Sequence, residues 1–344
     1  MITLTDIAEK AGVAVSTVSR VLNNKAQKYR ISKATRDLVL QAAKELNYHP
    51  NELARGLRLN KTHTIGLMVP DISNPFFAYI THVIQTQASQ YGYSLIVCST
   101  NENINTEVEQ IELLRRKGID GYIIMPIGTR YEHIEELLNL NKPVVLIDRC
   151  IDELNTNSVS VDNYTGAYNA VEHLINKGHT RIAIIQGLPN TSTNTARVNG
   201  YKDALTKNGI TVNPNYIVGN DFRKENGYIE TKLLINLESR PTAIFSTSDL
   251  ITLGALEAIS EENLSIPDDI SVVAFDDVDF APFLFAPLTA VRQPRELMGE
   301  VAVKILIENI STRTNPQKKS IVLKPELIVR KSVLDLGRVH SISA

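Results

Sequence analysis

Cysteine is scarce in this chain, and long apolar runs are absent. The 344 residues include two cysteines, Cys98 and Cys150, each inside an apolar, strand-like segment. We expect reduced packing residues rather than a disulfide or a metal pair, as is usual in a reducing cytoplasm. No run approaches 18 uninterrupted apolar residues, which argues against a transmembrane helix. The segment Met1-Ile2-Thr3-Leu4 has neither the basic nor the apolar region of a signal peptide, so we expect a cytosolic protein.

Motifs for catalysis and for metal binding are also missing. The patterns G-x-S-x-G, G-x-x-x-x-G-K-[ST] and H-E-x-x-H do not occur, and the seven histidines are scattered singly. In K-G-H-T-R, Gly178 is expected to end a helix in the left-handed conformation, which makes His179 a structural residue. The sequence therefore predicts neither an enzyme nor a cofactor or metal site.

Charge is distributed unevenly along the chain. With 43% hydrophobic residues, a chain of this length is expected to form two or three globular domains. Residues 1–61 contain 11 Lys and Arg against 5 Asp and Glu, a formal charge of +6, whereas residues 62–344 carry −8. The total of −2 thus conceals a basic head on an acidic body. Because basic segments gather phosphates, the head is the candidate for a nucleic-acid contact.

The head contains two short helical patterns that are separated by Gly12. Thr3 is placed to cap the first helix, with Asp6 three positions later as in a capping box. Gly12 removes the steric cost of a sharp turn. The second helix is expected over 15–22, with Val18, Val21 and Leu22 on its inner face.

The outer face of that second helix is polar and carries one cation. The cation is Arg20, and the other residues of this face are small and polar: Ser16, Thr17, Ser19 and Asn23. A helix-turn-helix inserts such a face into the major groove of DNA. An ordinary helical hairpin is the alternative, but its exposed face tends to be rich in Glu and Lys. The Ser/Thr-rich face therefore favours DNA binding.

A basic loop, residues 23–31, follows the second helix. Ser32 is expected to cap a third helix over 33–46, in which Leu38, Ala42 and Leu46 would close a small core. The segment N-E-L-A-R-G-L-R, residues 51–58, can form a helix capped by Asn51. Eight residues with an internal glycine are marginal as an isolated helix, so for the free protein we favour a disordered linker.

Beyond residue 64, apolar runs alternate with amphipathic helices, which is typical of a doubly wound parallel sheet. A first series of strands is expected at 65–69, 93–98, 121–125 and 144–147, with helices that begin near Pro75, Thr106 and Tyr131. A strand at 158–162 is expected to start a second series, with further strands at 182–186, 216–218, 243–246 and 271–275 and helices from about Asn163, Ser192, Lys224 and Asp249. Two such series predict two similar α/β lobes with a cleft between them.

Polar and aromatic residues follow the expected strands, and ligands bind beyond the carboxyl ends of such strands. These residues are Asp71, Asn74, Phe76, Asp148, Arg149, Thr191, Thr193, Arg197, Phe222, Ser248, Asp249 and Asp276. Each by itself fits a helix cap or a solvated loop residue, and Asp249 is expected to cap the helix that starts there. Together they suit a neutral polyol, whose hydroxyls both donate and accept hydrogen bonds. The set therefore favours a ligand cleft.

Several segments amount to a family signature. The most specific are D-I-A-E-K-A-G-V-A-V-S-T-V-S-R-V-L-N, A-A-K-E-L-N-Y-H-P-N, V-P-D-I-S-N-P-F-F, K-G-H-T-R-I-A-I-I and P-L-T-A-V-R-Q-P. With them the chain resembles the lactose/galactose repressor (LacI/GalR) family of bacterial transcription regulators over essentially its full length. The resemblance implies dimers or tetramers with a helix-turn-helix head, a hinge helix and a core similar to periplasmic sugar-binding proteins.

The resemblance also implies the domain boundaries. The head is expected at 1–50, the hinge helix and linker at 51–63, and the effector-binding and dimerisation core at 64–344. The chain is expected to cross between the core lobes three times. Lobe 1 then comprises about 64–161 and 293–322, and lobe 2 about 162–292 and 323–340.

By the same resemblance, DNA contacts are assigned position by position. Val15, Ser16 and Arg20 match residues that read bases, and Thr17, Ser19 and Asn23 match residues that contact phosphates. Leu57 matches a hinge leucine that enters the minor groove, with Arg55 and Arg58 beside it. The complete predicted DNA-binding set is Thr3, Val15, Ser16, Thr17, Ser19, Arg20, Asn23, Asn51, Arg55, Leu57 and Arg58.

In the cleft, Arg197 and Asp276 match effector positions that bind sugar hydroxyls, and Phe222 matches an aromatic lining position. An Arg197–Asp276 ion pair that merely stiffens the cleft is the alternative. Ser248 stands where sugar-binding members commonly have Asn, which leaves the identity of the effector open. The basic loop before Ser32 is longer than in the best-known members, which bears on the phosphate contacts.

The sequence thus predicts a dimeric transcription regulator, a repressor of a pseudo-palindromic operator, controlled by a small ligand such as a sugar or nucleoside. One alternative is a sugar-binding transport component with the same lobes, but the basic head and the missing signal peptide argue against it. The other is a cleft enzyme, which lacks a catalytic constellation. The segment L-D-L-G-R-V-H-S-I-S-A is too short for a convincing tetramerising heptad repeat.

Residues 51–58 are predicted to become helical only on operator DNA, since the segment is too short to hold a helix alone. Their amide hydrogens should exchange rapidly in the free protein and slowly in the complex. Hydrogen exchange of the full chain with and without operator measures this difference. Strong protection without DNA would contradict coupled folding.

Overall fold

The computed structural model of the chain describes residues 2–48, 61–128, 130–312 and 318–339. It divides into two compact units, Met1–Thr62 and His63–Ala344. Among the described residues, no helix is long and apolar enough to cross a membrane. The predicted contacts Asn51, Arg55, Leu57 and Arg58 lie outside the described residues.

The first unit contains three helices, α1 (Leu4–Ala11), α2 (Val15–Leu22) and α3 (Lys33–Glu45). The predicted capping box is present: the Asp6 amide donates to Thr3 Oγ1 (3.4 Å), and the Thr3 amide donates to Asp6 Oδ2 (2.7 Å). Gly12 has a φ of +64°, the left-handed conformation that glycine adopts readily. The helix-turn-helix prediction is confirmed.

The core of the first unit departs from the prediction at one residue. Leu38 was expected inside but is 54% exposed, whereas its neighbour Val39 is fully buried. Two stripes on α3, one from Leu38 and one from Val39, both include Ala42 and lead to Leu46, so helical spacing alone does not distinguish them. The buried members of this core are Ile7, Ala8, Val18, Val21, Ala26, Val39, Ala42 and Ala43.

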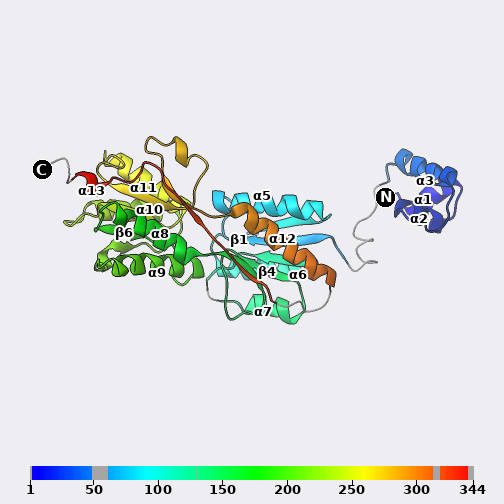
Figure 1. Cartoon of the computed structure of the whole chain (residues 1–344). Helices are drawn as coiled ribbons and strands as arrows, with labels where there is room; N and C mark the ends of the chain where they lie inside the picture. The colour runs from blue at the N-terminus through cyan, green and yellow to red at the C-terminus, as the bar shows by residue number, and fades with distance from the viewer. Residues whose placement is uncertain (1, 49–60, 129, 313–317, 340–344) are drawn as a thin grey trace. The chain divides into compact units, whose positions relative to one another are not determined.

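The second unit contains two α/β lobes (Figure 1). The sheet of lobe 1 is parallel, in the order β11-β5-β4-β3-β1-β2. Its strands are β1 (Thr64–Val69), β2 (Ser94–Ser99), β3 (Gly121–Ile124), β4 (Val144–Ile147), β5 (Asn157–Val161) and β11 (Ser320–Leu323). The helices of this lobe are α5 (Pro75–Gln90), α6 (Ile104–Arg116), α7 (Glu132–Asn139) and α12 (Arg295–Thr312).

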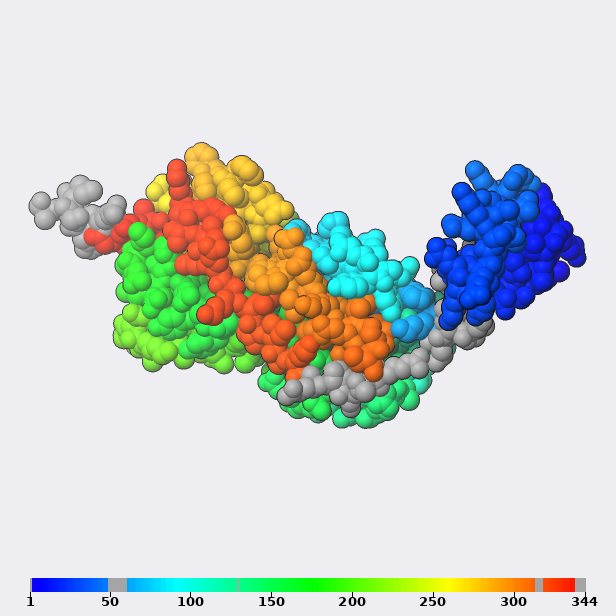
Figure 2. Space-filling model, turned by 45° about the vertical axis from the view of Figure 1, so that its right-hand side comes forward, coloured from blue at the N-terminus to red at the C-terminus, as the bar shows by residue number. Residues whose placement is uncertain are grey.

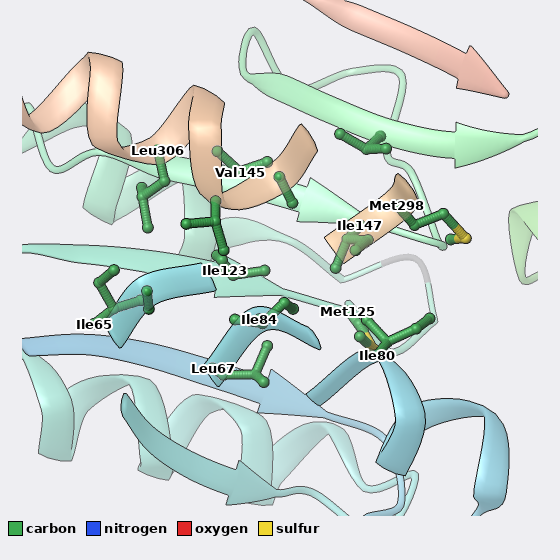
Figure 3. Close-up of a cluster of buried hydrophobic side chains, with 14 of the residues drawn as sticks. Ile65, Leu67, Ile80, Ile84, Ile123, Met125, Val145, Ile147, Met298 and Leu306 are labelled. Carbon is green, nitrogen blue, oxygen red and sulfur yellow. The ribbon is translucent and has the colours of Figure 1, made fainter. Parts of the chain in front are cut away.

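One core cluster of lobe 1 joins segments far apart in the sequence (Figure 3). Leu67 and Val145 of the sheet, Ile84 of α5, and Met298 and Leu306 of α12 belong to it. Since α12 follows lobe 2 in the sequence, its buried face ties the returning chain to the first sheet.

Lobe 2 has a second sheet in the order β12-β10-β9-β8-β6-β7, parallel apart from the edge strand β12. Its strands are β6 (Ile182–Ile185), β7 (Ile217–Val218), β8 (Ala243–Ser246), β9 (Ser271–Phe275), β10 (Thr289–Arg292) and β12 (Glu326–Ile328). Its helices are α8 (Asn163–Asn176), α9 (Ser192–Lys207), α10 (Lys224–Ile235), α11 (Asp249–Glu261) and α13 (Leu336–Val339), with short 3-10 turns η1 (Pro214–Tyr216) and η2 (Ala281–Phe283). The predicted fold class, a helical head and two doubly wound lobes, is confirmed.

The chain crosses between the lobes three times, after β5, after β10 and after β11. The late segments, orange to red in Figure 2, run over both lobes. The expectation that the strand at 158–162 opens the second series was wrong, because β5 pairs with β4 and β11 in the first sheet. Strand β10 was not predicted at all. An apolar pattern predicts a strand but does not say which of two equivalent sheets contains it.

His179 has the structural role that was predicted for it. Its ring is buried and hydrogen-bonds the Thr242 hydroxyl (2.9 Å) and the Leu334 carbonyl (3.1 Å). The preceding Gly178 has a φ of +87°. The imidazole thereby fastens the late segment to the strands of lobe 2. Cys98 and Cys150 are both free thiols.

Candidate DNA-binding and effector sites

The outer face of α2 is open to solvent. Val15, Ser16 and Arg20 are exposed, while Thr17 and Ser19 are partly buried. Residue Ala14 precedes the helix and gives it no side-chain cap. The Thr17 amide already donates to the Ala14 carbonyl (2.8 Å), so the amides of Val15 and Ser16 are those that can donate to an outside acceptor such as a phosphate oxygen.

The two ends of this face differ in how freely they can reach a ligand. Asn23 donates its side-chain amide to the Ser19 carbonyl (2.6 Å), which closes the end of α2. The side chain of Arg20 makes no hydrogen bond or ion pair among the residues that the structure describes, but its guanidinium lies over the ring of Tyr29, 4.2 Å from the centroid. The sequence pattern did not predict this Tyr29 contact.

In the second unit, the carboxyl ends of the two sheets meet. Asn74, after β1, donates its side-chain amide to Asp249 Oδ1, after β8 (3.1 Å). The Cys150 amide, after β4, donates to the Ser192 hydroxyl at the start of α9 (3.1 Å). Residues of both lobes therefore line one site.

Arg197 of α9 occupies the centre of this site and is buried. Its Nε donates to Asn163 Oδ1 (2.8 Å), its Nη1 donates to the Thr247 carbonyl (2.6 Å), and the guanidinium lies 3.7 Å from the centroid of the Phe275 ring. Burial lowers the pKa of Arg197, and the carboxylates of Asp276 and Asp148 oppose that shift. No ion pair joins Arg197 to Asp276 within the described part of the chain, so the stiffening ion pair considered above is not formed.

Asp148 and Asp276 occupy equivalent places in the two lobes. Asp148 follows β4 and Asp276 follows β9, which have the same position in their sheets. Both have a left-handed backbone, with φ of +66° and +82°, which is rare for residues other than glycine and is common at functional sites. The repeated geometry points one buried carboxylate from each lobe toward the shared site.

These carboxylates are difficult to ionise. Burial raises the pKa of Asp148 to about 6. Burial and the nearby Asp276 raise the pKa of Asp249 to about 6, and burial raises that of Asp276 against the influence of Arg197. Desolvation is the main cause in each case.

Arg149 is held rigidly at the edge of the site. It donates two hydrogen bonds to the Glu102 carboxylate (2.7 and 2.6 Å). The guanidinium also lies 5.2 Å from the Phe222 ring centroid and 5.9 Å from that of Phe77. Because Glu102 neutralises most of the charge of Arg149, the main role of this guanidinium is to pack against the rings of Phe222 and Phe77.

Two neighbouring residues have roles opposite to those expected. Ser248, not Asp249, caps α11, because its hydroxyl accepts from the Ile251 amide (3.3 Å). The expectation that Asp249 is the cap was wrong. Asp249 is the first residue of the helix, where its carboxylate reaches Asn74 across the cleft. A serine at the N-cap and an aspartate in the first turn are each favourable at the start of a helix. The sequence Ser248-Asp249 alone therefore does not show which of the two residues is the cap.

The remaining predicted residues are less central. Asp71 accepts hydrogen bonds from the amide and hydroxyl of Ser73 (2.8 and 2.7 Å), which commits one oxygen to a local turn. Phe76 is buried in the core of lobe 1. Thr191 is buried and donates to the Leu188 carbonyl (2.9 Å), and Thr193 is buried on α9.

Sequence reasoning missed two residues that hold the central charges. Asn163, after β5, binds Arg197, and Gln293, after β10, donates to Asp276 Oδ1 (2.6 Å). The strand-end rule points to both, but β5 was assigned to the wrong series and β10 was not expected. Each lies where the chain passes from one lobe to the other.

Several buried polar atoms in the cleft lack a hydrogen-bond partner among the described residues. They are Oδ1 of Asp148, Nε of Arg149, Oδ2 of Asp249 and Oε1 of Gln293. Buried polar groups are usually paired, so a cluster of unpaired ones indicates a place for a ligand with its own donors and acceptors.

Comparison with known proteins agrees with this arrangement. Residues 3–51 match the family model described as bacterial regulatory proteins, lacI family, and residues 62–327 match periplasmic binding proteins and sugar binding domain of LacI family. The chain belongs to the LacI family of bacterial regulatory proteins. It is therefore a DNA-binding transcription regulator with a ligand-binding core.

Relatives extend over nearly the whole of this LacI-family regulator. The HTH-type transcriptional repressor PurR of Photobacterium profundum is 34% identical and aligns over 98% of this chain and 100% of its own length. The ribose operon repressor of Haemophilus influenzae is 35% identical and aligns over 98% of this chain and 100% of its own length. A crystal structure of the lac repressor dimer bound to operator and the anti-inducer ONPF superposes with a TM-score of 0.85, at 29% identity, over 97% of this chain and 99% of that one.

Effector affinity of this regulator is predicted to increase from pH 5 to pH 7 and to level off above. Ligand hydroxyls donate to ionised carboxylates, and Asp148 and Asp249 ionise only near pH 6. Each carboxylate that accepts a hydrogen bond from the ligand contributes up to about a tenfold increase in affinity between pH 5 and pH 7. Titration calorimetry with the ligand that binds best measures the profile, and Asp148→Asn should remove the share of the increase that Asp148 contributes. An affinity that is constant or falls with rising pH would contradict a role for these carboxylates.

Proposed function

We propose that this regulator is a homodimeric repressor that acts in the cytoplasm on a pseudo-palindromic operator. A small, neutral, polyhydroxylated ligand, a sugar or a nucleoside, binds between the core lobes and controls DNA affinity. The protein acts by binding rather than by catalysis. The observation that carries the proposal is the cluster of buried, unpaired hydrogen-bonding atoms at the carboxyl ends of both sheets.

The charge balance of the cleft supports a neutral ligand. Asp148, Asp249 and Asp276 face Arg197, while Arg149 is neutralised by Glu102. A phosphorylated or carboxylated ligand would bring further negative charge to a site with more carboxylates than cations, which costs free energy in a buried environment. Hydroxyls avoid that cost, since they donate to carboxylates and accept from guanidinium groups.

The walls of the cleft suit the body of a sugar. Phe222 supplies a flat ring at the edge of the site, beside the Arg149 guanidinium. The name of the Haemophilus influenzae relative associates it with a ribose operon, which favours a sugar. The proposed effector set is Asp71, Asn74, Phe76, Asp148, Arg149, Thr191, Thr193, Arg197, Phe222, Ser248 and Asp276, to which we add Asn163, Asp249 and Gln293.

For the domains, we propose a head at 1–50, a hinge at 51–63 and a core at 64–344. The division into compact units at residue 62 supports the start of the core. In the head, we propose base contacts by Val15, Ser16 and Arg20 and phosphate contacts by Thr17, Ser19 and Asn23, with Thr3 at the start of α1. In the hinge, Leu57 enters the minor groove between Arg55 and Arg58.

A second copy of the chain is proposed to cover apolar side chains of the core. Ile229 and Leu233 of α10, Leu253 of α11, and Phe280 and Phe283 around η2 are all exposed. Large exposed apolar side chains mark association surfaces. The lac repressor structure similar to this chain is a dimer on operator DNA, which supports the same assembly.

Control follows from the position of the ligand between two lobes. Contacts such as Asn74 to Asp249 exist only when the lobes are close, and a ligand that binds there favours one lobe arrangement. The ligand changes operator affinity only by the ratio of its affinities for the two arrangements.

A ligand screen tests the proposed class. Thermal unfolding is measured with pentoses, hexoses, disaccharides and nucleosides, and with sugar phosphates and sugar acids of the same carbon skeletons. The proposal requires that a neutral compound raises the unfolding temperature and that its phosphorylated counterpart does not. Stabilisation by anionic compounds alone would overturn it.

Arg20→Ala is predicted to abolish selection at the operator base pair that Arg20 reads, while leaving effector affinity unchanged. A bidentate Arg–guanine contact provides about 1–3 kcal/mol of discrimination, and Arg20 is the cation of the exposed α2 face. Selection from a random duplex pool compares the variant with Arg36→Ala, an exposed Arg on α3. If Arg20→Ala recovers the wild-type sequence with equal stringency, Arg20 does not read bases.

Arg197→Ala and Asp276→Ala are each predicted to weaken effector binding by at least about tenfold. A lost partner leaves a buried charged group or a ligand hydroxyl unpaired, at about 1–3 kcal/mol. Calorimetry compares them with Arg116→Ala and Asp279→Ala, whose side chains are 70% and 87% exposed. Unchanged affinity in both folded variants would place the effector elsewhere.

A further inference from the structure

The side chain that is proposed to read bases is not free in the first unit. The Arg20 guanidinium lies over the Tyr29 ring, with 4.2 Å between its carbon and the ring centroid. Tyr29 belongs to the basic loop, residues 23–31, between α2 and α3. The loop therefore touches the outer face of α2 through one aromatic residue.

The backbone of this loop is fixed, although its side chains face solvent. Ala26 is buried in the core of the first unit, and Ile31 packs against the same core. Between them, the Ile31 amide donates to the Ala26 carbonyl (2.9 Å), and the Tyr29 amide donates to the Lys25 carbonyl (3.2 Å). The Lys25 amide in turn donates to the Arg20 carbonyl (2.8 Å). Tyr29 is 45% exposed but is held at a defined distance from α2.

The contact with Tyr29 does not consume the hydrogen-bond donors of the guanidinium. A guanidinium carries five N–H donors in its plane, whereas an aromatic ring attracts the cation through the face. Among the described residues, no acceptor engages those donors of Arg20. Two parallel donors remain available for the O6 and N7 acceptors of a guanine in the major groove.

We propose that Tyr29 is a positioning residue that holds Arg20 ready for base recognition. The proposal rests on the proposed function, in which α2 enters the major groove. An unsupported Arg side chain loses rotamer freedom when it binds a base, and a stack formed beforehand reduces that loss. The free energy gained appears only where Arg20 contacts its base pair, so Tyr29 affects discrimination at that pair and not the general attraction to DNA.

The loop offers a matched control for this distinction. Lys28 is the exposed neighbour of Tyr29 and carries a charge without an aromatic ring. Its removal should weaken binding to all duplexes to a similar extent and reduce the dependence of affinity on salt, since phosphates attract it without regard to sequence.

The experiment begins with selection of an operator by the full-length protein from a random pool. Dissociation constants are then measured for that operator and for every single base-pair substitution. The proteins are the wild type, Tyr29→Leu, Tyr29→Phe and Lys28→Ala, and the first three are repeated with Arg20→Ala. Thermal unfolding of each variant confirms that the exposed substitutions leave the fold intact.

We expect Tyr29→Leu to lower discrimination about two- to fivefold, the range of an exposed cation–π contact, at the base pair whose recognition Arg20→Ala removes. Discrimination at the other base pairs of the operator should be unchanged. Tyr29→Phe should discriminate as well as the wild type, because the ring is retained. In the Arg20→Ala background, Tyr29→Leu should have no further effect.

Three results would overturn the proposal. If Tyr29→Leu lowers discrimination equally in the wild-type and Arg20→Ala backgrounds, the two residues act independently. A loss in Tyr29→Phe as large as in Tyr29→Leu would assign the effect to a hydroxyl contact with the backbone of DNA. Unchanged discrimination in Tyr29→Leu would mean that the stack has no role in reading. If the wild-type protein selects no sequence at all, the proposed function fails, and this inference fails with it.

Discussion

The three crossings of the chain between its lobes are the constraint on which the effector site depends. They bring the carboxyl ends of two separate sheets together, and they also supply residues to the site. Asn163 lies at the first crossing and binds Arg197, and Gln293 lies at the second and binds Asp276. Both bonds hold side chains within lobe 2, where α8 packs against α9 and β9 pairs with β10. The crossings therefore position the central charges of the site at the point where the two lobes join.

The central charges are stabilised by more than mutual attraction. Arg197 has an aromatic face, an amide oxygen and a backbone carbonyl around it, and no carboxylate within ion-pair distance in the described part of the chain. The carboxylate oxygens of Asp148 and Asp276 can consequently still accept hydrogen bonds from a ligand, and the pKa values of both groups are raised. A site with unsatisfied donors and acceptors is destabilising until a ligand pairs them. The free energy recovered on pairing is available for binding and for the change in lobe arrangement.

Much of the fold could be predicted from local patterns, and the failures have physical reasons. Thr3, Asp6 and Gly12 define the helix-turn-helix, because caps and turns depend on neighbours in sequence. Leu38 was misplaced, since two stripes of α3 have helical spacing and only packing selects between them. Asn163 and Gln293 were missed because long-range pairing decides which sheet contains β5 and β10. The Tyr29 stack depends on a loop conformation that no periodicity encodes.

Thermodynamic reciprocity between the two sites tests the central claim most directly. Operator affinity is measured with and without saturating effector, and effector affinity is measured with and without operator, in the same buffer. The account predicts that both ratios differ from one and are equal, because a single lobe equilibrium links the two sites. An effector that binds tightly but leaves operator affinity unchanged would contradict the account.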